Sequence, residues 1–473
     1  MLKYESTHRL LFIVSDGMVH GAGNDRSTPQ ILLEILGAGT DIEPTAKAYY
    51  SVSEGRAKCM NYAKIYAGWY QTAETIIPYV VIVKVGLPQE LLKPGNRGKR
   101  DSQMILMRFL SKVLYEDPMT PLELEIYHQM KSVLGVDPNN YEYLFMVDAD
   151  TKVLPESLNR MISCCVHDLN VIGICGETRL ANEKRTWVTM IQVYEYYISH
   201  HISKAFESLF GTVTCLPGCF CLYRLKYSKN GKITPLLLNK KLLDDYAETN
   251  VDTLHKKNLL SLGEDRYLTT LTLKYFPDFR TKFTPDAVCL TAAPEKWSIL
   301  LSQRRRWINS TIHNLFELLL LPDMCGFCCL SMRFVVLMDL YGTLVMPASL
   351  VYLAYLIHGA TSSKIIPTIS ILLLAAVYGM QVMIFLLKRQ WQHIGWMVIH
   401  ILSLPLFGFY IPLYAYWHFD DFSWGNTRRV KDDHGTDLTS EECDGEELYE
   451  VITMKTWNEY CTDQWGTVTQ VSL

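Results

Sequence analysis

Tyr143–Thr151 reads YLFMVDADT, a short apolar run that ends in two aspartates separated by one residue. The run predicts a buried strand, and on an extended backbone residues i and i+2 face the same side. Asp148 and Asp150 therefore lie side by side, where their mutual repulsion favours a divalent cation such as Mg²⁺. A solvated turn is the ordinary alternative for such a pair. Its position at the end of an apolar run favours a ligand site.

Similar runs recur along the first 307 residues. Three more of them predict buried strands, at Arg9–Gly17, Ile77–Gly86 and Asn170–Glu177. Two segments predict helices from their start signals and apolar faces, Ser27–Gly37 and Asp101–Asp117. Strands that alternate with helices predict an α/β domain with a mostly parallel sheet, whose ligands lie beyond the carboxyl ends of the strands. Asp16, in the SDG that ends the first run, occupies such a position.

A basic, glycine-containing loop follows the second of these runs. KPGNRGKRDSQ, at Lys93–Gln103, carries Arg97, Lys99 and Arg100 directly before a predicted helix. Free N–H groups at a helix start, together with nearby cations, suit a phosphate group. The spacing is not that of a P-loop, so kinase or ATPase chemistry is not indicated. An ordinary basic surface turn is an equal alternative.

A second acidic group lies in LGEDRYLTTL, at Leu262–Leu271. Glu264, Asp265 and Arg266 fall at a predicted helix start. A carboxylate held among polar partners in a pocket can act as a general base. A helix-capping acidic pair with a salt-bridged arginine is the simpler interpretation, and this stretch taken alone favours it.

The apolar residues, 49% of the 473, are concentrated towards the C-terminus. Phe334–Ile357 and Ile365–Leu387 are each long enough to cross a bilayer core of roughly 30 Å. Ile394–Trp417 is a third candidate, interrupted by Pro405 and Pro412. We therefore expect a multi-pass membrane protein.

Three arginines and a tryptophan stand just before these segments, in SQRRRWINS at Ser302–Ser310. Arginine forks pair with diphosphate oxygens, and the flat indole of tryptophan can stack on a sugar ring. Positive charge on the inner side of a membrane helix would explain the arginines. It would not explain Gln303 or Trp307, and the two interpretations are compatible.

The charge of the chain is unevenly distributed. The net charge of −4 includes nine acidic residues between Asp432 and Glu450, so the rest of the chain carries +5. This modest basic bias suits an anionic ligand or a membrane surface. The overall basicity expected of a nucleic-acid binder is missing, so no nucleic acid is expected as a partner. The acidic stretch is expected to be a solvated extension.

The predicted sidedness follows from the positive charges that flank the apolar segments. Lys388 and Arg389 would lie inside after two crossings, as the charge rule requires. A single crossing by Ile394–Trp417 would carry Arg428 and Arg429 outside, against that rule. The breaks in the segment allow it to enter and leave on one face. We predict that it does not cross once and that the tail, 423–473, is cytosolic.

Taken in order, eight stretches resemble the fungal-type chitin synthases among the processive family 2 glycosyltransferases. They are SDG, GNRGKRDSQ, VDADT, QVYEYY, CLPGCF, GEDRYL, QRRRW and SWGNTR, the last at Ser423–Arg428. The resemblance implies a GT-A-like catalytic domain, UDP-N-acetylglucosamine as donor, Mg²⁺ or Mn²⁺, and a growing chitin chain extruded through the lipid bilayer. It implies a place in the plasma membrane and secretory vesicles with a cytosolic catalytic domain. It leaves a homo-oligomer open.

The resemblance also implies roles for individual residues. Asp16 would contact the uridine, Lys99 the diphosphate and Asp148 the donor, while Asp150 would bind the metal. The catalytic group would be Glu264, Asp265 and Arg266, with Asp265 removing the proton from the acceptor's 4-hydroxyl in an inverting displacement. The acceptor or product would be bound by Gln303, Arg306, Trp307, Gln192, Glu195 and Tyr196. The channel gate would be Leu216, Pro217 and Gly218.

These expectations divide the chain into four parts. They are a catalytic domain at 1–307, an interfacial amphipathic segment at 308–333, a transmembrane region at 334–417, and the SWGNTR motif with the acidic tail at 418–473. Family members carry a further strand–helix unit before the SDG strand, and only fifteen residues precede Asp16. We expect that unit to be missing and the chain to be N-terminally truncated, so the resemblance does not imply activity of this chain alone. The alternatives are an inactive or regulatory membrane partner of full-length synthases, and a related synthase that uses another UDP-sugar.

Overall fold

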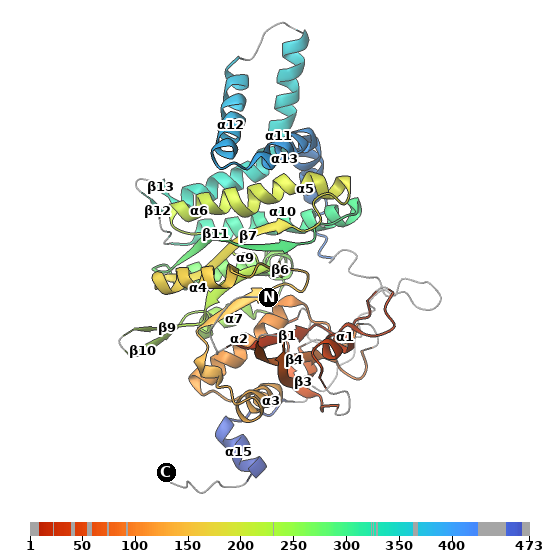
Figure 1. Ribbon diagram of the computed structural model, residues 1–473, viewed down its shortest axis with the longest axis vertical. Coiled ribbons are helices and arrows are strands. Elements are labelled where there is room, and N and C mark those ends of the chain that lie inside the picture. Colours follow the sequence, from red (N-terminus) through yellow and green to blue (C-terminus); the bar gives the residue numbers. More distant parts are fainter. Residues whose placement is uncertain are drawn as a thin grey trace. The chain divides into compact units, whose positions relative to one another are not determined.

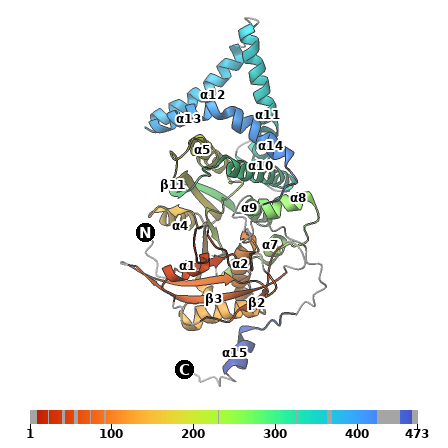
Figure 2. The same ribbon diagram turned by 90° about the vertical axis from the view of Figure 1, so that its right-hand side faces the viewer.

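The structure is a computed structural model that describes residues 9–465, except 22, 39–42, 54–58, 73–74, 91–92, 230, 323, 325, 328–329, 363–367 and 424–450. The chain forms two compact units, which are described separately (Figures 1 and 2). The N-terminal unit takes in Glu5–Tyr143, Leu225–Val251 and Asn426–Leu473. The membrane unit takes in Leu144–Arg224 and Asp252–Gly425, together with the first four residues.

The N-terminal unit is built on a sheet of strand order β1-β4-β3-β2. Its strands are β1 (Leu11–Ser15), β2 (Lys47–Tyr50), β3 (Met60–Gln71) and β4 (Ile76–Lys84). A separate hairpin pairs β9 (Lys226–Lys229) with β10 (Lys232–Pro235). The helices are α1 (Thr28–Ile35), α2 (Lys99–Tyr115), α3 (Pro121–His128), α7 (Lys240–Tyr246) and α15 (Trp457–Trp465). The continuous apolar sequence of β4 fits its place inside the sheet, where Val80, Val81 and Ile82 are fully buried.

The membrane unit contains a five-stranded sheet of order β5-β8-β7-β11-β6. Its strands are β5 (Tyr143–Val147), β6 (Lys152–Val153), β7 (Val171–Leu180), β8 (Phe220–Arg224) and β11 (Arg280–Thr291). The helices of its sheet region are α4 (Ser157–His167), α5 (Trp187–Tyr197), α6 (Ser203–Phe210), α8 (Leu254–Lys257), α9 (Glu264–Tyr275) and α10 (Trp297–Leu320). Among these helices, α4, α5 and α6 pack directly on strands of the sheet.

The expected α/β class is confirmed, but the sheets are mixed, and the prediction of a mostly parallel sheet was wrong on this point. Parallel pairing joins β1 to β4 and β7 to β11. Antiparallel pairing joins β2 to β3, β3 to β4, β7 to β8 and β6 to β11. An apolar run reports burial and not strand direction. In the hairpin of β3 and β4, Thr72 and Thr75 close the turn through a 2.8 Å backbone hydrogen bond.

The C-terminal part of the membrane unit is helical. It consists of α11 (Met332–Ser362), α12 (Thr368–Leu387), α13 (Trp391–Leu404), the π-helical turn η6 (Pro405–Tyr410) and α14 (Ile411–Trp417). Three helical stretches are long and apolar enough to cross a membrane, which confirms the expected membrane segments: Met332–Gly359, Thr368–Leu387 and Trp391–Trp417. In Figure 1, α11 and α12 extend away from the sheet, whereas α13 packs on α5 and α14 packs on α10.

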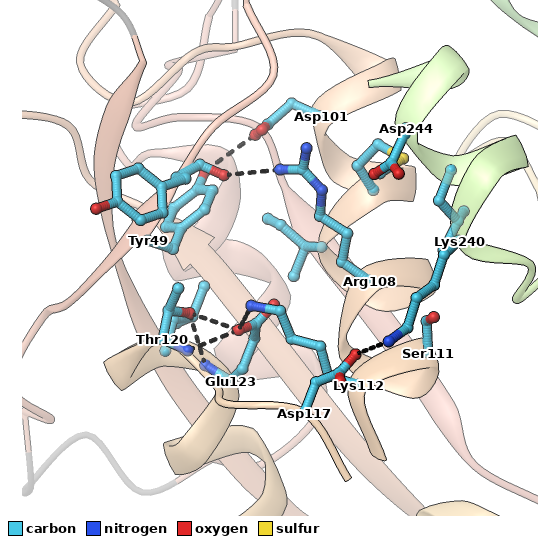
Figure 3. A pocket seen from close by; sticks show the side chains of 15 residues that line it. Tyr49, Asp101, Arg108, Ser111, Lys112, Asp117, Thr120, Glu123, Lys240 and Asp244 are labelled. Carbon is cyan, nitrogen blue, oxygen red and sulfur yellow. Dashed lines mark hydrogen bonds and ion pairs between the residues drawn. The ribbon is translucent and has the colours of Figure 1, made fainter. Parts of the chain in front are cut away.

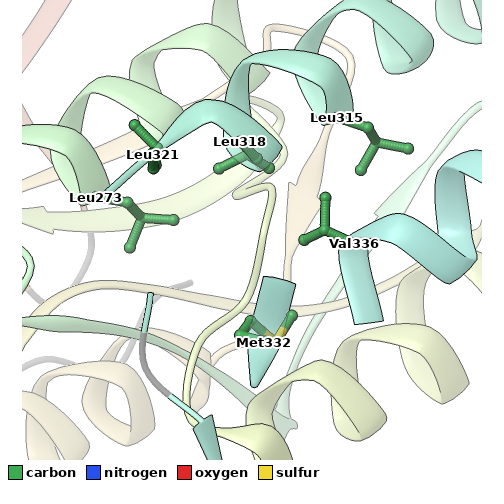
Figure 4. Packing of buried hydrophobic residues seen from close by; sticks show 6 residues of the cluster. All are labelled: Leu273, Leu315, Leu318, Leu321, Met332 and Val336. Atoms are coloured by element: carbon green, nitrogen blue, oxygen red, sulfur yellow. The ribbon is translucent and has the colours of Figure 1, made fainter. Parts of the chain in front are cut away.

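A buried apolar cluster connects the helical part to the sheet region of the same unit. Leu273 of α9, Leu315 and Leu318 of α10, and Met332 and Val336 of α11 pack together with Leu321 (Figure 4). Since α10 runs without interruption from Trp297 to Leu320, the boundary expected at residue 307 falls inside this helix. The QRRRW motif and the start of the expected interfacial segment are therefore one rigid element.

Candidate active site

The loop Leu216–Cys219 connects the DxD motif to the acidic start of α9. The backbone N–H of Asp148 donates to the carbonyl of Cys219 at 3.4 Å. A Cβ atom at Gly218 would lie 2.2 Å from the carboxylate of Asp265, so any larger residue here would have to displace that carboxylate. Leu216 N–H donates to Thr269 Oγ1 of α9 at 3.0 Å. The structure thus brings together the predicted donor carboxylate, gate loop and base.

Asp150 fits the donor set that a hard cation needs. It lies on an exposed turn, where Thr151 Oγ1 donates to its Oδ1 at 3.3 Å. A hydrogen bond from Cys219 lowers the pKa of Cys289, and the negative charges of Asp148 and Asp150 oppose that shift. Both carboxylates are therefore close enough to influence the same thiol. Among the described residues no group of three or more His, Cys, Asp or Glu side chains could hold a metal ion. Mg²⁺ commonly takes one or two carboxylates plus substrate phosphates, which matches this pair.

The first turn of α9 carries Glu264 and Asp265. Glu264 is buried at 6% exposure, and Asp265 is more accessible. Two acidic residues there also complement the helix dipole. Arg306 of α10 is held near this turn: burial lowers the pKa of its guanidinium, and the charge of Glu264 opposes the shift. Arg266 follows on the same turn, half-buried.

A second cluster joins α5 to α10. Arg304 is 3% exposed, its Nη2 lies 2.5 Å from Glu195 Oε2, and its Nη1 donates to Gln303 Oε1 at 3.1 Å. Its guanidinium carbon lies 4.2 Å from the ring centroid of Trp307 and 5.4 Å from that of Tyr196. The rings of Tyr196 and Trp307 meet edge to face at 6.1 Å. The predicted acceptor residues of the two helices are therefore in contact through an arginine that was not predicted.

Gln192 occupies a different environment from its predicted neighbours. Its side chain is fully buried, and its amide donates to the carbonyls of Val188 at 2.8 Å and Pro294 at 3.0 Å. Its Oε1 is within 3.4 Å of Arg304 Nη2. Gln192 thus supports Arg304 from behind, and its role in binding an acceptor stays a prediction.

Arg305 fixes the segment that follows α14. Its guanidinium pairs with Asp421 and donates to the carbonyl of Ser423 at 2.5 Å. One turn further along α10, Asn309 Nδ2 donates to the carbonyl of Ala415 at 3.0 Å. Ser423 begins the SWGNTR motif, whereas residues 424–428 and the acidic stretch lie outside the described residues. The three neighbouring arginines of QRRRW therefore contact three different parts of the membrane unit.

Asp16, one of the two predicted donor residues of the N-terminal unit, lies at the centre of a compact hydrogen-bond network. Its carboxylate accepts from the backbone N–H groups of Arg97 and Gly98 and from Lys84 Nζ, each at 2.9 Å. Lys84 is fully buried and also pairs with Asp101 at 2.6 Å. Gly98 has a φ of +91°, which favours glycine, and it immediately precedes α2.

The three cations of the basic loop have different surroundings. Arg97 pairs with Glu90, and Arg100 donates to the carbonyls of Tyr246 at 3.2 Å and Glu248 at 2.8 Å. Lys99 stands half-buried at the first position of α2. Its place at the helix start suits contact with an anion.

A cavity of about 410 Å³ lies elsewhere in the N-terminal unit, beside α2, α3 and α7 (Figure 3). Lys112 pairs with Glu123 and Lys240 with Asp117, both at 2.6 Å. Arg108 reaches the carbonyl of Tyr50 at 3.4 Å. None of the predicted site residues lines this cavity.

Sequence reasoning missed Arg304, Arg305 and Lys84. All three had a signal. The two arginines stand inside QRRRW, and Lys84 interrupts the otherwise apolar run of β4. A buried lysine requires a carboxylate partner, and this requirement points to the neighbouring strand end that carries Asp16.

An α/β unit with converging carboxylates, continued by an arginine- and tryptophan-bearing helix into membrane segments, is characteristic of a membrane-bound glycosyltransferase. The family comparison is specific. A sequence model of the chitin synthase family matches residues 1–463, and the chain belongs to this family.

Three similar relatives are fungal. Chitin synthase 6 of Mycosarcoma maydis is 58% identical over 466 residues, which cover 98% of this chain and 39% of that protein. Chitin synthase A of Aspergillus oryzae is 58% identical over 92% of this chain and 25% of its own length. Chitin synthase 4 of Cryptococcus neoformans var. grubii is 55% identical over 98% of this chain and 36% of its own length. The chain thus spans between 25% and 39% of the length of these relatives.

Proposed function

We propose that the protein containing this chain is a chitin synthase. It transfers N-acetylglucosamine from UDP-N-acetylglucosamine to the 4-hydroxyl of a growing β-1,4 chain, with inversion, and extrudes that chain through the membrane. The observation that carries this proposal is the loop Leu216–Cys219. The carbonyl of Cys219, at one end of the loop, accepts a hydrogen bond from the backbone N–H of Asp148. Gly218 lies directly against the carboxylate of Asp265. The predicted donor residue and the predicted base therefore both lie next to one short loop.

In the proposed reaction Asp265 accepts the proton of the acceptor's 4-hydroxyl as that oxygen attacks the anomeric carbon. General base catalysis of this kind is typically worth about 10²–10⁴ in rate. The bond to the UDP oxygen breaks as the new bond forms, and negative charge develops on the diphosphate. Arg306, held near Glu264, can meet that charge without reorganising. Asp150, with Asp148 two residues before it in the chain, would hold Mg²⁺ or Mn²⁺, and the cation would supply further positive charge to the diphosphate.

We assign the other ends of the substrates to the remaining predicted residues. Asp16 and Lys99 would bind uridine and diphosphate, in agreement with the helix start that follows Gly98. Trp307 and Tyr196 would hold the terminal sugar of the acceptor. Their aromatic rings, in contact with a buried arginine, are suited to this role. Leu216, Pro217 and Gly218 would line the entrance of the polymer channel.

The function is tested with the full-length protein in isolated membranes, supplied with one labelled UDP-sugar at a time. We expect a polymer from UDP-N-acetylglucosamine that chitinase degrades, and none from UDP-glucose or UDP-glucuronic acid. A polymer from either of these two sugars would assign the protein to a related synthase. Absence of polymer from all three would contradict the proposal.

We also propose that the catalytic residues and the tail share the cytosolic side. The chain after α14 returns to α10 through Arg305 and Asn309, so the third apolar segment begins and ends beside the sheet region. In the N-terminal unit, the N–H of Met119 donates to the carbonyl of Lys455 at 2.8 Å. Trp457 lies 4.3 Å from Tyr127, centroid to centroid. Residues that precede and residues that follow the described membrane helices are therefore packed together, which supports an even number of crossings.

This sidedness is tested with Cys461 as the reporter in a background without other cysteines. In intact cells we expect no labelling by a membrane-impermeant thiol reagent until the membrane is permeabilised. Labelling before permeabilisation would place the tail outside and overturn the topology. The same reagent on a cysteine introduced at His358, near the C-terminal end of α11, should react in intact cells and is the positive control.

A further inference from the structure

Arg304 has no assigned role, and its surroundings are unusual for an arginine at the edge of a membrane region. Its side chain is almost fully buried, and Glu195, Gln192 and Gln303 each contact its guanidinium. A buried charge needs a paired partner, and Glu195 supplies one from α5. The pair therefore joins two helices through residues that are 109 positions apart in sequence.

The guanidinium of Arg304 also covers aromatic surface. It lies 4.2 Å from the centroid of Trp307 and 5.4 Å from that of Tyr196, both within the distance of a cation–π contact. Trp307 itself is only half-buried, so part of its indole stays accessible. Tyr196 also stacks with His200, with 5.1 Å between the ring centroids. Burial lowers the pKa of His200 to about 3, and Lys204 and Arg304 act in the same direction, so this ring is neutral at pH 7.

These contacts restrict both rings that would meet a sugar. An indole attached to a helix by two torsions can turn, and the planar cation over one face removes that freedom. Lysine cannot replace the planar fork, because its ammonium is a point charge that neither stacks nor bonds two ways. The geometry therefore requires arginine and not merely positive charge.

We propose that Arg304 is a positioning residue for the acceptor end of the reaction. It fixes the planes of Trp307 and Tyr196 through its charge pair with Glu195, so that the terminal sugar presents its 4-hydroxyl to the base. This inference rests on the proposed function, because it concerns the acceptor of that reaction. Arg304 acts through the two rings and through neither the donor nor the metal.

The test compares Arg304→Lys with Glu195→Gln, the two together, and Arg160→Lys as a surface control. Arg160 lies in the same unit, half-exposed, 3.7 Å from Asp286. Full-length protein in membranes is assayed for polymer turnover, for UDP released per sugar incorporated, and for the KM of UDP-N-acetylglucosamine. Arg304→Met is a further variant that keeps much of the side-chain volume without the charge.

For Arg304→Lys we expect kcat for polymer to fall about tenfold, because the planar stacking of the guanidinium on the rings and its fork of donors are lost. The KM for the donor should stay within about twofold, and more UDP should be released per incorporated sugar. Glu195→Gln should give the same pattern, and the double variant should be no worse than Arg304→Lys alone, since both remove one interaction. Arg160→Lys should behave as the unsubstituted protein.

Two results would overturn the inference. One is normal elongation by Arg304→Lys, and the other is an equal loss of donor affinity and turnover, which a merely structural role would give. If Arg304→Met fails to fold, the two conservative variants still decide the question. Failure of the proposed function is a separate result, since it would appear as absence of polymer in the unsubstituted protein.

Discussion

Asp16 in the N-terminal unit and Asp150 in the membrane unit both follow an apolar strand, yet their carboxylates have different surroundings. Asp16 accepts two backbone N–H groups and the ammonium of the buried Lys84. Asp150 is exposed and accepts one hydroxyl, from Thr151. The same sequence pattern has thus produced one carboxylate that organises a loop and one that remains available for a ligand.

This difference predicts two classes of substitution. Removing a carboxylate that holds the fold leaves buried donors without partners, which costs stability. Removing a carboxylate available for a ligand should cost reaction rate or metal affinity and leave the fold intact. Asp16 and Glu177 belong to the first class, and Asp265 and Asp150 belong to the second.

The largest effect is expected for Asp265→Asn. The substitution keeps the size of the side chain beside Gly218 but removes the base, so the polymer rate should fall by about 10²–10⁴. The unfolding temperature in detergent should not change. Radiolabel incorporation and thermal unfolding are measured on the same preparation, with the exposed Asp286→Asn as control. Near-normal polymer synthesis would remove Asp265 from the reaction.

Asp150→Ala should act on the metal. We expect the divalent-cation concentration for half-maximal activity to rise by about 100-fold, since even groups behind a metal ligand are worth about 10–100-fold. Chelation with EDTA should stop the unsubstituted enzyme, and added Mg²⁺ or Mn²⁺ should restore it. An unchanged cation dependence would show that Asp150 is not a ligand.

The sequence predicted the parts of the site better than their connections. Apolar runs and start signals located the strands that end at Asp16 and Asp148 and the helices that begin near Lys99 and Asp265. These signals are local, within one strand or one turn of helix. The predicted strand direction was wrong because an apolar run buried on both faces is typical of an inner strand in parallel and in antiparallel sheets alike.

The connections that were missed are long-range. Arg304 and Glu195 are 109 residues apart, and Arg305 and Ser423 are 118 apart. No periodicity relates residues at such separations. The arginines of QRRRW could therefore be predicted to have binding partners, but the sequence could not show that each arginine has a different one. The family resemblance gave roles to Gln303, Arg306 and Trp307 and left the two arginines between them without one.

Asp16→Asn belongs to the first class. The NH₂ group of the new amide would face a backbone N–H, and two donors cannot form a hydrogen bond. Lys84 would keep only the carboxylate of Asp101 as an ion-pair partner among those of Asp16 and Asp101. We expect the free energy of unfolding to fall by about 2 kcal/mol, a factor of about 30 in the folded-to-unfolded ratio. Chemical denaturation of the detergent-purified protein measures this. A variant as stable as the unsubstituted protein would show that Asp16 does not organise the loop.

The smallest effect is expected at a carboxylate of the first class in the membrane unit. Glu177 of β7 is buried and contacts Arg179 Nη2 at 2.9 Å and His201 Nδ1 at 3.2 Å. Burial raises the pKa of Glu177, but hydrogen bonds from His201 and Arg179 outweigh burial and lower it to about 2. The folded protein therefore binds fewer protons here than the unfolded chain, whose glutamate has a pKa of 4.5.

The sign of the pH dependence follows from this. The stabilisation is complete above about pH 4.5 and is lost as the pH falls towards about 2. Glu177→Gln should lower the free energy of unfolding by about 1 kcal/mol at pH 7, a few-fold effect, and should flatten the decline between pH 5 and pH 3. The exposed Glu34→Gln is the control, and Asp265→Asn, from the second class, should keep the decline unchanged. Parallel curves for Glu177→Gln and the unsubstituted protein would mean that Glu177 does not hold the fold, and the division into two classes would then fail within the membrane unit.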